Sequence, residues 1–171
     1  MKRSAVHPAS LSVTDVAFPR IWHGVRVERA PESEQPFPID ALAVEDDTWQ
    51  VLGADPDFRP SVEHPIRVMQ ALHKAQPVAA GTVVVRAGAP IRLHAIVHDL
   101  DLEPTWREEW ISAALKEIFR ISSECGYRAL GLPLLGARHG RPSHALSLSL
   151  LDGALARPAN GTLRKLWLIA S

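Results

Sequence analysis

Several short segments of this chain are apolar on both faces, and this feature restricts the possible fold more than any other. In Ile39–Val44 the apolar side chains do not alternate with polar ones, apart from Asp40. A strand of this kind is stable where other elements cover both sides of its sheet, as in proteins that alternate strands with helices. The segment therefore predicts a sheet enclosed between helix layers.

The order of the predicted elements indicates the fold class. Strands are predicted at 21–27, 39–44, 82–86, 92–97, 129–134 and 163–169, and helices at 61–75, 105–125 and 143–155. This order is typical of a three-layer α/β/α domain with a mixed sheet. In such a sheet, ligands bind where the strands end and the loops meet helix N-termini.

The helix predicted at 105–125 has the clearest boundaries. Thr105 and Glu108 have the spacing of a capping box, in which each side chain accepts a backbone N–H at the helix start. Gly126 then provides the left-handed residue that ends a helix. Cys125, the only cysteine, lies at the end of the apolar face and is predicted to be buried. One thiol alone cannot form an internal disulfide or a cysteine zinc site.

The length of 171 residues suits a single domain, which we expect over residues 18–171, with residues 1–17 as an N-terminal arm. The N-terminal stretch lacks the continuous apolar core of a targeting segment. No apolar run is long enough to span a membrane. We therefore expect a cytoplasmic protein without a membrane partner.

The net charge of zero is the sum of opposed blocks. Residues 28–57 hold nine acidic residues against one Arg, whereas residues 120–171 hold seven bases against two acids. A neutral total argues against an extended nucleic acid or an anionic membrane as a partner, because those partners require a strong positive field. A small anion bound beside the basic block remains compatible with these charges.

The segment from Leu132 to Ser143 is the strongest candidate for a ligand loop. It leaves a buried strand, passes Gly136 and Gly140 within five residues, and enters a helix at a serine cap. Backbone amides in such a turn, together with a helix N-terminus, form an anion site, and Arg138 adds a cation suited to phosphate. A plain strand-to-helix turn that needs glycine for its backbone angles is the alternative.

Four sequence motifs, in the same order, are similar to those of the macro domain family, the ADP-ribose-binding α/β modules. Ile39–Val44 resembles the family strand VDAIV, and Ala95–His98 resembles yVIH. Ala80–Thr82, which precedes a predicted strand, resembles the family motif G-x-x-x-T at the start of a strand. Glu124–Pro133 follows e-x-G-xx-S-I-A-F-P, and Gly136–Pro142 falls where the family has G-T-G-x-G-x-P. The resemblance covers about 39–157.

The resemblance implies a mixed sheet of roughly six strands and a cleft for ADP-ribose or a related nucleotide diphosphate, with no cofactor. The family's phosphate loop would be formed here by Gly136, Ala137, Arg138, His139 and Gly140. A second loop, after the strand at 39–44, would hold the distal ribose.

The second loop departs from the family pattern. Where the family usually has Asn-x-x-Asn, this chain has Glu45, Asp46 and Asp47, followed by Trp49. Ionised carboxylates only accept hydrogen bonds. They could bind ribose hydroxyls, hold a divalent cation or activate water, or they could form a solvated acidic turn. Trp49 could stack on a base or belong to the core.

The phosphate loop departs from the family pattern at Arg138, which replaces its middle glycine. The guanidinium could pair with a bound phosphate, or it could close the pocket by pairing with Asp46 or Asp47. His94, His98, Asp99 and Asp101 resemble a metal cluster. We interpret them as strand and loop residues, so no metal site is predicted.

Three functions remain open from the sequence. The first is a module that binds ADP-ribose or a related nucleotide diphosphate through the loop from Gly136 to Gly140, with Glu45 and Trp49 as further contacts. The second is a degenerate module that acts in protein interaction or regulation without binding a nucleotide. The third is a hydrolase of ADP-ribosyl or phosphate esters with Asp46 or Asp47 as the base.

Overall fold

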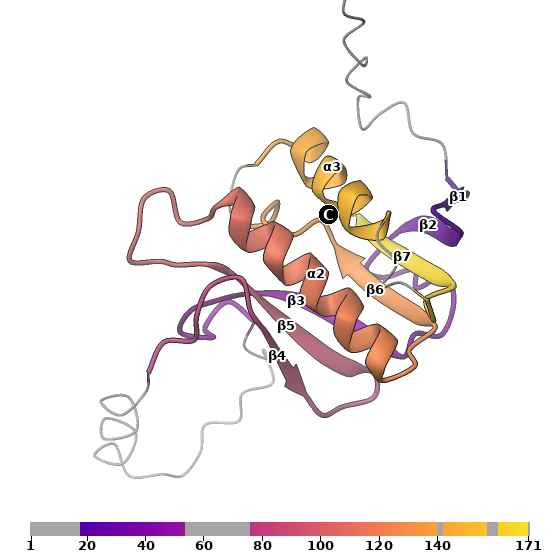
Figure 1. Cartoon of the computed structure of the whole chain (residues 1–171), viewed down its shortest axis with the longest axis horizontal. Coiled ribbons are helices and arrows are strands. Elements are labelled where there is room, and N and C mark those ends of the chain that lie inside the picture. The colour runs from indigo at the N-terminus through magenta and orange to yellow at the C-terminus, as the bar shows by residue number, and fades with distance from the viewer. Residues whose placement is uncertain (1–17, 54–75, 140–141, 157–160, 171) are drawn as a thin grey trace, which may run out of the picture.

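The computed structural model describes residues 18–53, 76–139, 142–156 and 161–170 (Figure 1). Three sequence predictions lie outside these residues: the N-terminal arm at 1–17, the helix at 61–75, and the part of the glycine loop formed by Gly140 and Arg141. The strands and helices within the described residues all match predicted segments, and most ends differ by three residues or fewer.

The described part of the chain forms one mixed sheet of seven strands. In chain order they are β1 (Arg20–Trp22), β2 (Val25–Pro31), β3 (Ala41–Asp47), β4 (Val83–Arg86), β5 (Ile91–His98), β6 (Ala129–Pro133) and β7 (Lys165–Ala170). Their order across the sheet is β1-β2-β7-β6-β3-β5-β4. The five inner strands are parallel, and the edge strands β1 and β4 are antiparallel to their neighbours. The predicted α/β class with a mixed sheet is confirmed.

The seventh strand comes from the segment predicted as a single strand at 21–27. His23 and Gly24 have positive φ values of 49° and 80°, so the chain reverses there. Arg20 pairs with Val27 and Trp22 with Val25 across the resulting hairpin. A strand prediction based on apolar content does not detect a turn at a His-Gly pair inside the run.

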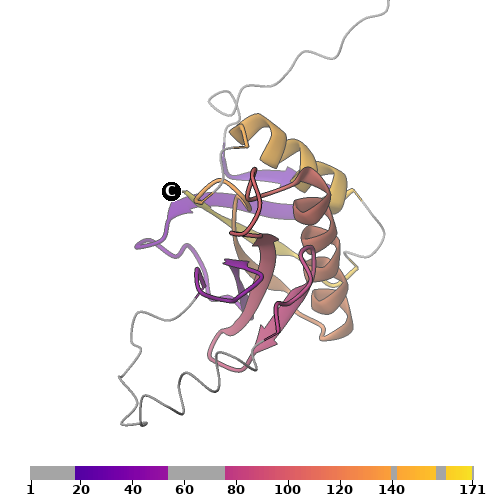
Figure 2. The same ribbon diagram turned by 90° about the vertical axis from the view of Figure 1, so that its left-hand side faces the viewer.

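Two helices, α2 (Glu108–Glu124) and α3 (His144–Leu155), lie together on one face of the sheet (Figures 1 and 2). The core between α2 and the sheet contains fully buried side chains such as Leu93 and Ala95 from β5 and Ile111 and Ile118 from α2. Neither helix has the length and apolar composition of a membrane span, and no other helix occurs in the described ranges.

The start of α2 differs from the predicted capping box. The N-cap residue is Arg107, without a side-chain hydrogen bond. Thr105 is instead part of the preceding loop, where its carbonyl accepts the N–H of Asp99 at 2.7 Å. The helix ends at Glu124, and Gly126 follows the C-cap residue with a left-handed φ of 71°, as the sequence predicts. Cys125, predicted to be buried, is exposed because the apolar face ends before it.

Candidate functional site

The loops that follow β3, β5 and β6 meet at the carboxyl edge of the sheet. These strands are parallel neighbours, so their carboxyl ends lie at the same edge. The N–H of Thr48 donates to the carbonyl of His98 at 3.0 Å. The ring of His139 lies edge-on to that of His98, with centroids 6.0 Å apart. The two loops predicted to bind a ligand are therefore both in contact with the end of β5.

Glu45 holds the glycine loop from inside the protein. Glu45 is only 4% exposed. The carboxylate accepts hydrogen bonds from the backbone N–H of Gly136 at 3.0 Å and of His139 at 3.2 Å. It also bonds to Nε2 of His98, which is fully buried. Three donors on two elements thus converge on one carboxylate, which fixes the loop relative to β3 and β5.

Asp46 points to the opposite face of the sheet from Glu45, because successive strand residues alternate. Its Oδ2 lies 2.9 Å from Nδ1 of His94, and its Oδ1 accepts the N–H groups of Gly53 and Asp47, each at 2.9 Å. Burial alone would raise the pKa of Asp46. The hydrogen bonds from His94, Gly53 and Asp47 outweigh that effect, so the pKa of Asp46 is lowered from 3.8.

Asp47 shapes the turn after β3. Its Oδ1 accepts the N–H of Trp49 at 2.7 Å, and its Oδ2 accepts those of Val51 at 2.9 Å and Leu52 at 2.7 Å. In an irregular turn, backbone N–H groups have no partners from a helix or a sheet. The Asp47 carboxylate accepts hydrogen bonds from three of them and so stabilises the turn.

The three acids therefore do not form the solvated turn that was one of the sequence interpretations, since all three are buried. Asp46 and Asp47 are both 0% exposed, and each of their carboxylates binds groups of the protein itself. Within the described ranges, no group of His, Cys, Asp and Glu side chains is arranged to hold a metal ion. Their role in this structure is to secure the loops of the edge.

The described part of the glycine loop is tightly packed on its inner side. Gly136 has a φ of 83°, and a Cβ there would lie 2.7 Å from Cδ1 of Ile111, so this position requires glycine. The N–H of Ala137 donates to the carbonyl of Leu134 at 3.1 Å. At the far end of the loop, Ser143 accepts the N–H of Leu146 at 3.2 Å and caps α3, as the sequence predicts.

Arg138 and His139 are exposed on the outer side of this loop. Among the described residues, Arg138 forms no ion pair with Asp46 or Asp47, so the closed pocket considered from the sequence is absent from this structure. Trp49 is 43% exposed, and its Nε1 donates to Oδ2 of Asp101 at 3.1 Å. The outer surface of the edge thus presents an aromatic ring and two basic side chains.

Replacing Gly53 with alanine should lower the free energy of unfolding by about 2 kcal/mol, because the added methyl overfills a packed site. A Cβ at Gly53 would lie 2.6 Å from Oδ2 of Asp46 and 2.8 Å from Nδ1 of His94. Urea denaturation measures the change. Gly153→Ala is the matched control, since nothing lies within 4 Å of a Cβ at that position. Equal stability of the two variants would contradict the close approach.

The described residues form an open, mainly parallel sheet with helices on one face and a glycine loop at the carboxyl edge, which places the chain in the α/β class. The chain has the macrodomain fold. The macrodomain of Thermus aquaticus DarG superposes with a TM-score of 0.60 at 20% identity, over 86% of this chain and 100% of that one. The macrodomain of Mycobacterium tuberculosis DarG gives a TM-score of 0.62 at 16% identity, over 86% of this chain and 100% of that one.

The Oceanobacillus iheyensis macrodomain, in a structure with ADP, superposes with a TM-score of 0.60 at 9% identity, over 86% of this chain and 85% of that one. No protein-family profile matches the sequence, and a search of curated proteins finds no match either. The relationship is thus visible in the fold and not in the overall sequence.

Proposed function

We propose that this protein binds a nucleotide diphosphate such as ADP-ribose at the carboxyl edge of the sheet. The observation that carries the proposal is the exposed pair Arg138 and His139, which the buried Glu45 holds in place at the end of β6. The similarity to macrodomains solved with ADP and, as a mutant, with ADPR supports this class of ligand.

The phosphates would contact mainly side chains in the described part of the loop. The N–H groups of Gly136 and His139 already donate to Glu45, and that of Ala137 donates to Leu134. The guanidinium of Arg138 offers a planar set of donors that matches two phosphate oxygens at once. Glu45 then positions the loop rather than touching the ligand, and the exposed indole of Trp49 offers a surface for a base.

Calorimetric titration with ADP-ribose tests the proposal. Arg138→Ala should weaken binding about tenfold or more, because a hydrogen bond between charged groups contributes about 1.5–3 kcal/mol. Added salt should also weaken binding to the wild type. Arg128→Ala is the control, since Arg128 is exposed just before β6, at the opposite end of the same strand. Absence of heat at millimolar ADP-ribose, or equal affinity of Arg138→Ala and wild type, would exclude this mode of binding.

A module without nucleotide binding is the second candidate, and one observation favours it. The carboxylate of Glu45 already occupies two backbone donors of the loop that would otherwise be available to an anion. A folded protein that shows no binding of ADP-ribose would support this candidate. Hydrolysis by Asp46 or Asp47 has no support from the geometry, because neither carboxylate is exposed.

A further inference from the structure

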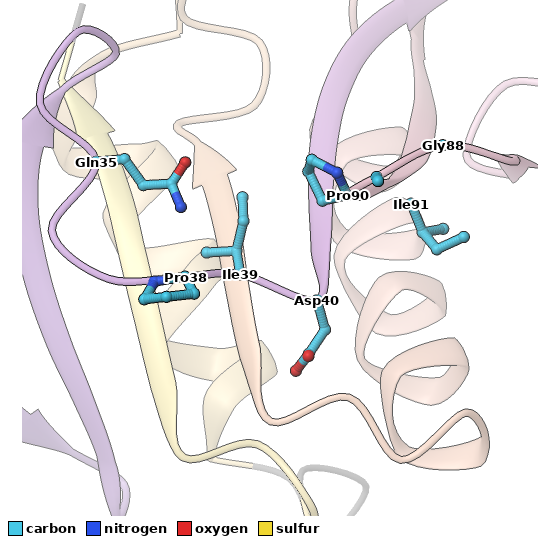
Figure 3. Close-up of a pocket in the computed structure, with 8 residues that line it drawn as sticks. Gln35, Pro38, Ile39, Asp40, Gly88, Pro90 and Ile91 are labelled. Atoms are coloured by element: carbon cyan, nitrogen blue, oxygen red, sulfur yellow. The ribbon is translucent and has the colours of Figure 1, made fainter.

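The cavity shown in Figure 3 lies too far from Arg138 to hold the base of the proposed nucleotide. Its volume is about 450 Å³, and its lining includes Asp40, just before β3, and Ile91, the first residue of β5. Arg138 follows β6, at the carboxyl edge. β5 is eight residues long, so about 23 Å separate its two ends, more than the distance between a base and its phosphates. The base would therefore contact the loops at the carboxyl edge.

The loops after β3 and β5 expose several large apolar side chains at this edge. Among the described residues, four such side chains belong to these two loops, namely Trp49, Val51, Leu100 and Leu102. Trp49 is the aromatic member of this group. An indole exposed to solvent on one side offers a flat apolar surface on which a base can stack.

Asp101 fixes the orientation of the Trp49 ring. Its Oδ2 accepts Nε1–H of Trp49 at 3.1 Å. The N–H of Asp101 donates to Oδ1 of Asp99 at 3.0 Å, and the N–H of Asp99 donates to the carbonyl of Thr105 at 2.7 Å. The backbone of Trp49 is held separately, because its N–H donates to Oδ1 of Asp47. The ring is thus positioned before a ligand binds, which lowers the entropy cost of stacking.

Trp49 and the glycine loop both adjoin His98, the last residue of β5. The N–H of Thr48 donates to the carbonyl of His98 at 3.0 Å, and Trp49 follows Thr48 directly. The ring of His139 lies edge-on to that of His98, with centroids 6.0 Å apart. One nucleotide can therefore place its base at Trp49 and its phosphates at Arg138.

The contact that this ring offers favours a large base without distinguishing one purine from another. The N–H of the indole is already donated to Asp101, so the ring has no hydrogen-bond donor left for a base. Stacking depends on the face of the base and tolerates changes in its hydrogen-bonding groups. A purine has two fused rings and buries more apolar surface on the indole than a pyrimidine does.

We propose that Trp49, positioned by Asp101, selects nucleotides with a purine base by stacking, whether the purine is adenine or guanine. This inference rests on the proposed function, since it concerns the base of a ligand whose phosphates contact Arg138. It defines the ligand class as purine nucleoside diphosphates and their sugar conjugates, of which ADP-ribose is one. Trp49 contacts the base, and Asp101 acts through Trp49 as a positioning residue.

Calorimetric titration of the full chain with ADP, GDP, UDP and inorganic pyrophosphate tests this selection. ADP and GDP should bind within about threefold of each other, and UDP about fivefold more weakly. Trp49→Ala should weaken the binding of ADP and GDP about tenfold, that of UDP less, and that of pyrophosphate not at all. Ile21→Ala is the control at an exposed apolar residue of β1, the edge strand on the far side of the sheet from β5.

Variants of Asp101 test its positioning role. Asp101→Ala leaves the indole without its hydrogen-bond partner and should lower the ratio of ADP affinity to UDP affinity about threefold. Asp101→Asn keeps an oxygen that accepts the indole N–H, so it should restore the ratio. Because the readout is a ratio between two ligands, a general loss of affinity would not reproduce it. An unchanged ratio in Asp101→Ala would contradict the role of Asp101.

The outcomes separate this inference from the proposed function. Equal affinities for ADP and UDP, or a purine preference that survives in Trp49→Ala, overturn selection by stacking. A preference for ADP over GDP of about tenfold or more also overturns it, because that preference requires recognition of the hydrogen-bonding groups of the base. In all these cases, weaker binding in Arg138→Ala still supports the phosphate site. Absence of binding by pyrophosphate and by every nucleotide overturns both proposals.

Discussion

Replacing Glu45 with glutamine is expected to lower the free energy of unfolding by about 3–5 kcal/mol, because it disrupts a buried, fully bonded charge. The carboxylate accepts hydrogen bonds from Gly136, His139 and His98. Glutamine has one acceptor oxygen and one amide nitrogen, so at least one backbone N–H would face another donor. The loop would then lose its attachment to β3.

Urea denaturation of Glu45→Gln and wild type at neutral pH measures this change. Glu117→Gln is the matched control, since Glu117 forms an ion pair with Arg120 on the surface of α2 and such pairs contribute at most about 1 kcal/mol. Hydrogen exchange gives a local readout, in which the amides of Gly136 and His139 should lose protection. A loss below about 1 kcal/mol with both amides still protected would contradict the role of Glu45.

Asp46→Ala is expected to destabilise the protein by about 3 kcal/mol at neutral pH, since it leaves three buried donors without an acceptor. These donors are Nδ1–H of His94 and the N–H groups of Gly53 and Asp47. Asp101→Ala is the control at an exposed acid with one side-chain hydrogen bond to Trp49. Thermal or urea unfolding that gives equal losses for the two variants would argue against the Asp46 network.

The contribution of Asp46 to the free energy of unfolding also depends on pH, because the carboxylate stabilises the fold in its ionised form. The folded protein holds the pKa of Asp46 below 3.8, so its ionised form stabilises the fold fully at pH values above 3.8. This contribution is lost as the pH falls through the lower pKa of the folded state. The difference in unfolding free energy between wild type and Asp46→Asn should therefore shrink below pH 3.8. A constant difference down to lower pH would contradict the assignment.

The fold follows from local patterns that the sequence displays directly. Apolar runs predict β3, β5, β6 and β7, and their order with the helix patterns predicts an α/β sheet. The glycine loop and its Ser143 cap are also local signals, and the structure places the described part of the loop at the edge of the sheet. These features are determined by residues close together in the sequence, so they can be predicted from short segments.

The roles of Glu45 and Asp46 could not be predicted in this way, because their partners are distant in sequence. Asp46 bonds to His94, 48 residues away, and Glu45 bonds to His98 and Gly136, which are 53 and 91 residues away. The acids alone suggest a ligand loop, and the histidines alone suggest a metal site. A usable signal was the pairing of β3 with β5. Asp46 lies opposite Ile96, two residues from His94, and Glu45 lies opposite Ala95, three residues from His98.

The alternation of Glu45, Asp46 and Asp47 on one strand has a consequence for the engineering of this protein. Glu45 joins β3 to the glycine loop, Asp46 joins it to Gly53 on the other face, and Asp47 holds the intervening turn. Neither loop can be exchanged independently, because each depends on a carboxylate supplied by the strand. A chimera that receives the glycine loop of a protein with the same fold would need the matching residue at position 45 in the same transplant. Substitutions in the loop alone should be tolerated only where they preserve the donors that face Glu45.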